Sequence, residues 1–337
     1  MFVDETTGEL KWEVMAHRGQ GQDATAAMSP DGSLVASVGR NHRHWKLWDA
    51  ASGVLHMAGA IHDRTGGMVH TKGVKVLVFS PCGQWLATGG EDTAVILWDA
   101  QTGKAAHRMT GHSRRVLALS FSADGARLAS GGDDRSIRLW DVPSGALLRM
   151  IPQAHDDVVY SLHFSPANNH TLSSMGHSQN AHIWDANTGQ RIRVVPGQRF
   201  AVFSPDGRTI ATVDSEAGHV LLINAQTGDL LTTMLGHTGT IMSASFSIDG
   251  SKLASCSLGS VPSCKVWDPS TGALLRTILF NDGVFSVAWG RDWVRDTQRV
   301  EAFAMGHHPR LGAGSQVLGL DEEVLRMLVG KKCETGA

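Results

Sequence analysis

The side chains best able to do chemistry in this sequence are its histidines, which number 17 among 337 residues. Two pairs suggest a metal site: His42 and His44 flank one arginine, and His307 adjoins His308. A zinc ion, however, needs three or four converging protein or water ligands, and the adjacent His307 and His308 would point to opposite faces of a strand. We therefore expect neither a metal site nor a bound cofactor.

Sequence patterns that carry catalytic chemistry are absent from the chain. It contains no G-x-S-x-G, no H-E-x-x-H and no G-x-x-x-x-G-K-[ST]. These are the patterns of a nucleophile elbow, a zinc-protease helix and a phosphate-binding loop. We therefore expect no catalytic residues and a protein that is not an enzyme.

The cysteines are few and scattered, at Cys82, Cys256, Cys264 and Cys333. This usage is typical of a reducing compartment. Cys256 and Cys264 face each other across a predicted hairpin. They are expected to be free thiols, with a redox-sensitive disulfide as the alternative.

Two sequence landmarks recur along the chain and keep step with each other. The first resembles Phe-Ser-Pro-Asp-Gly and ends at Gly32, Gly83, Gly125, Asn168, Gly207 and Gly250. The second is Trp-Asp, with tryptophans at Trp48, Trp98, Trp140, Trp184 and Trp267, and with Ile223 standing in once. A shared period of about 40–45 residues is that of a four-stranded propeller blade.

Each repeat reads as a series of short strands. In the unit 115–151, turns rich in Gly, Asp, Pro and Ser separate four runs: 116–121, 127–130, 136–140 and 146–151. Short apolar runs bounded by such turns predict consecutive antiparallel hairpins.

These features make the chain resemble the WD40 repeat family over nearly its whole length. The resemblance implies an all-β, seven-bladed propeller in which a loop histidine, a strand serine or threonine, a turn aspartate and the tryptophan form a hydrogen-bonded tetrad. Two sets match in full: His70, Thr88, Asp92 and Trp98, then His112, Ser130, Asp134 and Trp140. A satisfied buried polar network makes a blade rigid, so we interpret these residues as structural.

The other blades keep only part of the tetrad. The retained members are Ser37 and Trp48 in the first blade, His155, Ser174 and Trp184 in the fourth, none in the fifth, and His237, Ser255 and Trp267 in the sixth. Ser178 replaces the aspartate of the fourth blade, and the corresponding turn of the sixth is longer by two residues.

The two ends of the chain are expected to build the seventh blade together. Residues 284–289, 299–305 and 315–320 predict three strands without a Trp-Asp, and residues 7–15 resemble the strand that follows Trp-Asp elsewhere. As in WD40 proteins, the N-terminal strand would then complete the last blade of one domain spanning 1–337. Residues 320–330 have the spacing of an amphipathic helix, which either packs on the propeller or docks a partner.

The resemblance also implies a binding surface on the narrow face, where the loops leading into each blade meet the turns between its second and third strands. Loops on a rigid scaffold commonly carry recognition. The matching positions are Lys72, Arg114, Arg115, Asp157 and Tyr160 in the loops, and Glu91, Asp133 and His177 in the turns. The long connection 56–72 is a second candidate contact.

Composition limits the partners. The chain has 30 Lys and Arg against 32 Asp and Glu, a formal charge of −2, which gives no electrostatic signature of nucleic-acid binding. The acidic N-terminus lacks an apolar run, and no apolar stretch is long enough to span a membrane. We expect a monomeric propeller in the cytoplasm, with the nucleus as the alternative location.

The predicted function is a non-catalytic scaffold that binds a peptide or protein partner within a multi-subunit assembly. The alternative is a substrate-recognition adaptor of a ubiquitin ligase. Many such adaptors end a blade with Trp-Asp-x-Arg, but none of the five Trp-Asp pairs here has that arginine. A propeller hydrolase or lyase would need carboxylates or histidines lining the channel, and the aligned positions have none.

Overall fold

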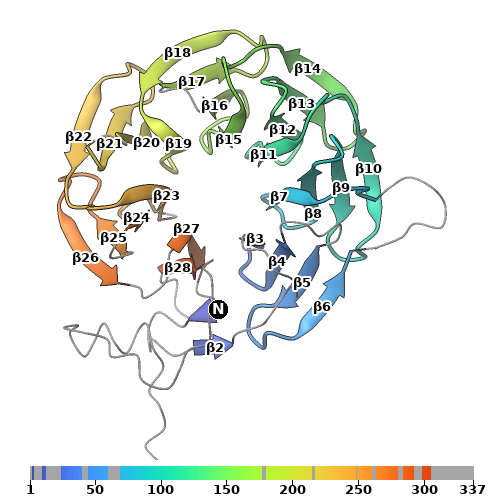
Figure 1. The fold of residues 1–337 in the computed structure, drawn as a ribbon, viewed down its shortest axis with the longest axis horizontal. Helices are drawn as coiled ribbons and strands as arrows, with labels where there is room; N and C mark the ends of the chain where they lie inside the picture. Colours follow the sequence, from blue (N-terminus) through green and yellow to red (C-terminus); the bar gives the residue numbers. More distant parts are fainter. Residues whose placement is uncertain are drawn as a thin grey trace, which may run out of the picture.

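The computed structural model describes residues 2–3, 10–12, 24–39, 45–59, 69–176, 180–214, 217–247, 249–259, 263–279, 284–291 and 298–304. Every regular element in these ranges is a β-strand. No helix among them has the length and hydrophobicity to cross a membrane. The strands form six four-stranded sheets and two two-stranded sheets, arranged as blades around a central axis (Figure 1). The predicted all-β propeller is confirmed.

Each blade consists of four strands that are consecutive in the chain and antiparallel. Blade one contains β3 (Ala24–Met28), β4 (Leu34–Gly39), β5 (Lys46–Asp49) and β6 (Leu55–Ala58). Blade two contains β7 (Val74–Phe79), β8 (Trp85–Gly90), β9 (Val95–Asp99) and β10 (Ala105–Met109). Blade three contains β11 (Val116–Phe121), β12 (Arg127–Gly132), β13 (Ile137–Asp141) and β14 (Leu147–Ile151).

The next three blades repeat this order. Blade four contains β15 (Val159–Phe164), β16 (Thr171–Gly176), β17 (Asn180–Asp185) and β18 (Arg191–Pro196). Blade five contains β19 (Gln198–Phe203), β20 (Thr209–Asp214), β21 (His219–Asn224) and β22 (Leu230–Met234). Blade six contains β23 (Thr240–Phe246), β24 (Leu253–Leu258), β25 (Ser263–Trp267) and β26 (Leu274–Leu279).

The first strand of each blade lies nearest the axis and the fourth lies at the circumference (Figure 1). We call the segment before the first strand the leading loop, and the three connections within a blade its first, second and third turns. In the first turn of blade three, Ser122 Oγ donates to Asp124 (2.6 Å) and accepts from the Arg127 N–H (3.0 Å). Gly125 follows with a φ of 70°, a conformation that glycine adopts without strain. The Phe-Ser-Pro-Asp-Gly pattern therefore encodes this turn.

The hydrophobic core lies between neighbouring blades. One buried cluster joins Ile137 and Leu139 of blade three to Leu162, Leu172 and other residues of blade four. Close approach of the blades depends on small residues. A Cβ added at Gly131 on β12 would lie 2.6 Å from Val159 Cγ1 on β15, so a larger side chain there would push the two blades apart.

A second set of contacts between blades runs along the circumference. On β10, His107 donates from Nε2 to the Pro143 carbonyl in the third turn of blade three (2.9 Å). On β18, Arg193 donates to the carbonyls of Thr227 (2.5 Å) and Gln226 (2.8 Å) in the third turn of blade five. We call these contacts outer latches. Each joins the fourth strand of one blade to the blade that follows it in the chain.

The ring differs from the expected seven complete blades. The described residues form six four-stranded blades, followed by a two-stranded sheet of β27 (Val284–Arg291) and β28 (Gln298–Ala304). β27 packs against β23 and β24 of blade six, between blades six and one (Figure 1).

The N-terminal strand does not pair with this last sheet. β2 (Leu10–Trp12) pairs instead with β1 (Phe2–Val3) in a separate two-stranded sheet, and β1 lies beside β28. The resemblance implied that residues 7–15 would complete the last blade, whereas within the described residues β2 pairs with β1. The predicted strand 315–320 and helix 320–330 lie outside the described residues, so completion of a seventh blade stays a prediction.

Candidate partner-binding face

Blade two contains the first complete tetrad. His70 donates from Nδ1 to Asp92 (2.7 Å), Thr88 Oγ1 donates to His70 Nε2 (2.8 Å), and Trp98 Nε1 donates to Thr88 Oγ1 (2.8 Å). Asp92 also accepts the backbone N–H of Thr71 (2.9 Å). These hydrogen bonds connect the leading loop to the second turn at the buried end of the blade.

Blade three repeats the arrangement. His112 donates to Asp134 (2.8 Å) and accepts from Ser130 (2.7 Å), whose Oγ accepts the Trp140 Nε1–H (2.8 Å). Ser136 donates a further hydrogen bond to Asp134 (2.8 Å). All four tetrad members therefore meet at hydrogen-bond distance in both blades where the sequence predicts them.

The pKa values of both tetrad aspartates are lowered. Burial by itself would raise the pKa of Asp92, but the hydrogen bond and charge of His70, the Thr71 N–H and Arg108 hold it well below its usual range. At Asp134 the opposing groups are His112 and Ser136, and the pKa is again well below the usual range. A buried carboxylate that accepts several hydrogen bonds fixes the groups that donate them.

The rim residues above these tetrads include ion pairs within the chain. Lys75 on β7 contacts Glu91 in the second turn of blade two (2.9 Å), and Arg115 contacts Asp133 in the second turn of blade three (2.5 Å). The hydrogen bond from Lys75 is the main cause of a lowered pKa at Glu91. Arg115 and Asp133, predicted as a mixed-sign contact for a partner, thus pair with each other.

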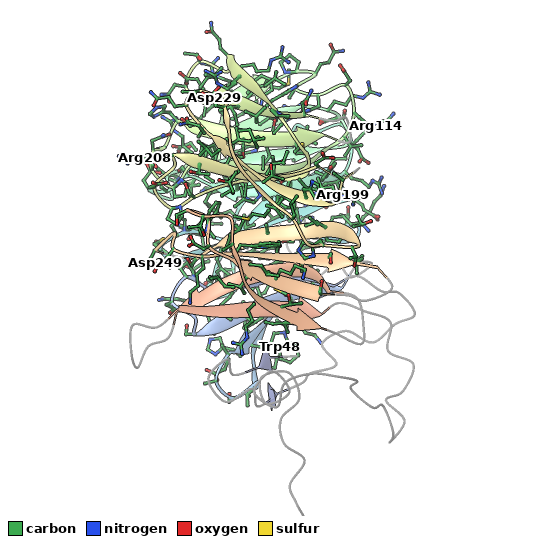
Figure 2. The ribbon with its side chains drawn as sticks, turned by 90° about the vertical axis from the view of Figure 1, so that its left-hand side faces the viewer. Trp48, Arg114, Arg199, Arg208, Asp229 and Asp249 are labelled. Atoms are coloured by element: carbon green, nitrogen blue, oxygen red, sulfur yellow. The ribbon has the colours of Figure 1, made fainter. Side chains whose placement is uncertain are left out.

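Lys72 and Arg114 differ from these paired residues. Both lie in leading loops, both are exposed, and no ion pair joins either to another described residue. Arg114 lies on one face of the propeller, whereas Arg208 and Asp249, near the first turns of blades five and six, lie on the other (Figure 2). We call the side with Arg114 the leading face.

The remaining predicted contact residues belong to blade four. Tyr160 on β15 is half-buried and packs against the cluster that contains Met175 and Ala201, and burial raises the pKa of its hydroxyl. Asp157 accepts the backbone N–H of Val158 (2.7 Å). Tyr160 therefore supports the packing between blades four and five. His177 and the long connection within 60–68 lie outside the described residues.

Blade four carries an incomplete tetrad. His155 Nε2 is hydrogen-bonded to Ser174 (2.7 Å), and Trp184 donates to the same hydroxyl (2.7 Å). His155 Nδ1 is buried and has no hydrogen-bond partner. The ring instead stacks on His182 of β17, with centroids 4.1 Å apart. Burial, followed by the charges of His182 and Arg191, lowers the pKa of His155 to about 4.

In blade six a serine occupies the place of the aspartate. His237 is hydrogen-bonded through Nδ1 to Ser257 (2.8 Å) and through Nε2 to Ser255 (2.7 Å), and Trp267 donates to Ser255 (2.7 Å). Neither Ser257 nor His182 was identified from the sequence. Both lie two positions from a tetrad member on the same strand, so the alternation of side chains along a strand could have indicated them.

Among the described residues, no loop histidine completes the tetrad of blade one or of blade five. In blade one, Trp48 donates to Ser37 (2.8 Å). In blade five, Thr212 Oγ1 is buried without a hydrogen-bond partner, and a Cβ at Gly197, directly before β19, would overlap the Thr212 side chain. The short connection between β18 and β19 therefore leaves no space for the histidine.

The cysteine pair lies where the hairpin pattern predicts. Cys256 on β24 is opposite Cys264 on β25, and both are buried free thiols. Burial raises the pKa of both thiols, that of Cys264 to about 12. A thiol protonated at neutral pH is a poor nucleophile. Within the described ranges, no three His, Cys, Asp or Glu side chains are placed to hold a metal ion. His42, His44, His307 and His308 lie outside those ranges.

Comparison with known proteins agrees with this blade-by-blade pattern. A family model described as "WD domain, G-beta repeat" matches residues 67–99, 103–141, 146–185 and 228–268. The segments end with the third strands of blades two, three, four and six, the blades that contain a loop histidine. The match thus distinguishes these blades from blades one and five.

Solved structures share the fold. The structure of U3-55K superposes with a TM-score of 0.69 at 20% sequence identity, covering 81% of this chain and 86% of that one. The crystal structure of RRP9 WD40 repeats gives a TM-score of 0.68 with the same identity and coverage. A comparison with curated protein sequences finds no match.

Proposed function

We propose, from the premise that the chain is a WD40-repeat β-propeller, that it acts as a non-catalytic scaffold within a multi-subunit assembly. The partner is a peptide or protein segment that binds the leading face. The observation that carries this proposal is the pair of complete tetrads, which fix the leading loops of blades two and three, and these loops carry exposed Lys72 and Arg114. Rigid loops lose little conformational entropy when a partner binds.

The proposal includes a cytoplasmic location. The described cysteines Cys82, Cys256 and Cys264 are free thiols, which supports a reducing compartment. Fluorescence microscopy of the tagged full chain tests this part, and accumulation in an oxidising compartment would contradict it.

Affinity purification of the full chain from native extract, with quantitative mass spectrometry, tests the scaffold role. We expect a reproducible set of co-purifying subunits that is lost in Arg114→Ala/Arg115→Ala and retained in Arg208→Ala, a matched change on the other face. Equal recovery from both variants would show that the leading face is not the binding surface. Cullin-family subunits among the partners would favour a ubiquitin-ligase adaptor instead.

A further inference from the structure

Positive charge on the described part of the leading face concentrates over blades two and three. Lys72 and Arg114 each stand two residues after a tetrad histidine, and both are exposed. Arg135, in the second turn of blade three, is also exposed, and its backbone has a φ of 64°. No ion pair neutralises any of the three within the described residues. This sector therefore presents three uncompensated cations on a rigid frame.

Two rim carboxylates of the same sector already pair with cations, although Asp133 Oδ1 is buried without a hydrogen-bond partner. Glu91 contacts Lys75, and Asp133 contacts Arg115. The charges of Arg115 and Lys72 also contribute to the low pKa of Glu91, after the hydrogen bond from Lys75. Glu91 and Asp133 therefore each have a cationic partner, and the remaining charge of this sector, on Lys72, Arg114 and Arg135, is positive.

The positive sector ends at blade four. The residue two positions after His155 is Asp157, where blades two and three have Lys72 and Arg114, and the adjacent Asp156 is exposed. Complementary charge steers encounter and fixes the orientation of a partner. A bound segment would therefore place its acidic part over blades two and three and not over blade four.

We propose that Lys72, Arg114 and Arg135 form a binding site for an acidic peptide segment of a partner protein. This rests on the proposed function, because it names the chemistry of the partner at the same face. Arginine suits this role, since its guanidinium can donate two parallel hydrogen bonds to one Asp or Glu carboxylate. A peptide whose Asp and Glu residues are separated along its sequence can contact these three cations without bringing a carboxylate next to Glu91 or Asp133.

A nucleic acid fits the same sector less well. Nucleic-acid affinity depends on several phosphates being neutralised along a continuous backbone. Here Glu91 and Asp133 lie among the cations and would repel adjacent phosphates. The chain as a whole also has a formal charge of −2, so attraction for a polyanion would be confined to this sector.

Selection from a phage-displayed library of random peptides against the immobilised full chain tests the proposal. We expect enrichment of peptides with several Asp or Glu residues. Their binding, measured by fluorescence anisotropy, should weaken from about 0.15 M to about 1 M salt, as the Debye length falls from about 8 Å to about 3 Å. Enrichment of neutral or basic peptides, or of none, would overturn it.

Charge-reversal variants test whether Lys72 and Arg114 bind the acidic peptide. Lys72→Glu/Arg114→Glu should weaken binding of the selected acidic peptides by about tenfold or more, whereas Arg208→Glu on the opposite face should leave it unchanged. Unaltered thermal unfolding of both variants would show that the fold is intact. Equal binding by both variants would overturn the assignment, as would a random single-stranded RNA that binds more tightly than the peptides and depends on the same cations. Loss of native partners in Arg114→Ala/Arg115→Ala without acidic selection would overturn this inference and leave the scaffold proposal standing.

Discussion

Blades three and four contain the same histidine, serine and tryptophan chain, but only blade three adds a carboxylate. Asp134 accepts the Nδ1–H of His112, whereas Nδ1 of His155 is buried without a partner and its ring stacks on His182. The difference shows that the histidine-to-tryptophan geometry does not require the aspartate. The aspartate instead adds a charged anchor that fixes the leading loop of blade three.

Removing the histidine should cause the largest difference between the two blades. His112→Ala removes one hydrogen-bond donor of the Asp134 carboxylate and the acceptor of the Ser130 hydroxyl. Two buried groups each lose a partner, at a cost of about 1–3 kcal/mol of unfolding free energy per group. His155→Ala leaves no buried charge and should cost about 1–3 kcal/mol. Urea unfolding measures both values. Equal losses would contradict the anchoring role of Asp134.

Removing the carboxylate should have a smaller effect. Asp134→Ala leaves the donors of His112, Ser113 and Ser136 without their acceptor, at a cost of about 1–3 kcal/mol. The neighbouring Asp133→Ala serves as the control, because it removes the ion pair with Arg115 but no member of the tetrad. A melting temperature that falls as much in Asp133→Ala as in Asp134→Ala would show that the tetrad carboxylate contributes nothing of its own.

Acid should destabilise the blades that lack a carboxylate first. Burial lowers the pKa of His155, His237 and His163 to about 4, below the value of about 6.5 in an unfolded chain. The unfolded state therefore binds more protons, and stability falls as pH drops from about 6.5 towards 4. Asp92 and Asp134, whose pKa values are depressed, lose their contribution only below about pH 4.

The pH dependence can be assigned to one blade by substitution. Between pH 7 and pH 5, His155 should account for about 1–2 kcal/mol of lost unfolding free energy. His155→Asn should reduce the pH dependence by that amount, as measured by urea unfolding at the two pH values. An unchanged pH dependence of the unfolding free energy would mean that His155 has the same pKa in the folded and unfolded states.

The rim of blade three should contribute least to stability. The Arg115 side chain is 52% exposed, and ion pairs of this kind contribute under about 1 kcal/mol. Arg115→Ala should therefore change the melting temperature far less than Asp134→Ala, although both changes remove a contact between the leading loop and the second turn of the blade. A comparable change would place the anchor of the loop at the rim and not in the tetrad.

The fold could be predicted because its signals are local. Ser122, Asp124 and Gly125 specify a turn within a few residues of chain, and Trp140 with Asp141 marks the third strand of the same blade. Repetition of these signals gives the strand order. The number of complete blades depends on which sheet edge the N-terminal strand joins. That pairing joins the two ends of the chain, and no short-range pattern determines it.

The candidate site was predictable only in part, for a related reason. The repeated spacing within the chain located the leading loops and second turns, and therefore Lys72 and Arg114. Spacing does not show that Arg115 turns to Asp133 or that Tyr160 packs between blades, because side-chain direction depends on contacts across the sheet. The replacement of an aspartate by Ser257 in blade six likewise follows from three-dimensional proximity to His237.

The outer latches also have a consequence for how the protein is made. His107 and Arg193 reach forward along the chain, to carbonyl groups of the blade synthesised next. Each of these side chains therefore has no partner until the carbonyl group 33 to 36 residues further along the chain has been added. At about 5–20 residues per second, blades two and four remain without these contacts for several seconds while the following blade is synthesised. The outer strands of blades two and four are thus fastened only by a blade that is synthesised later.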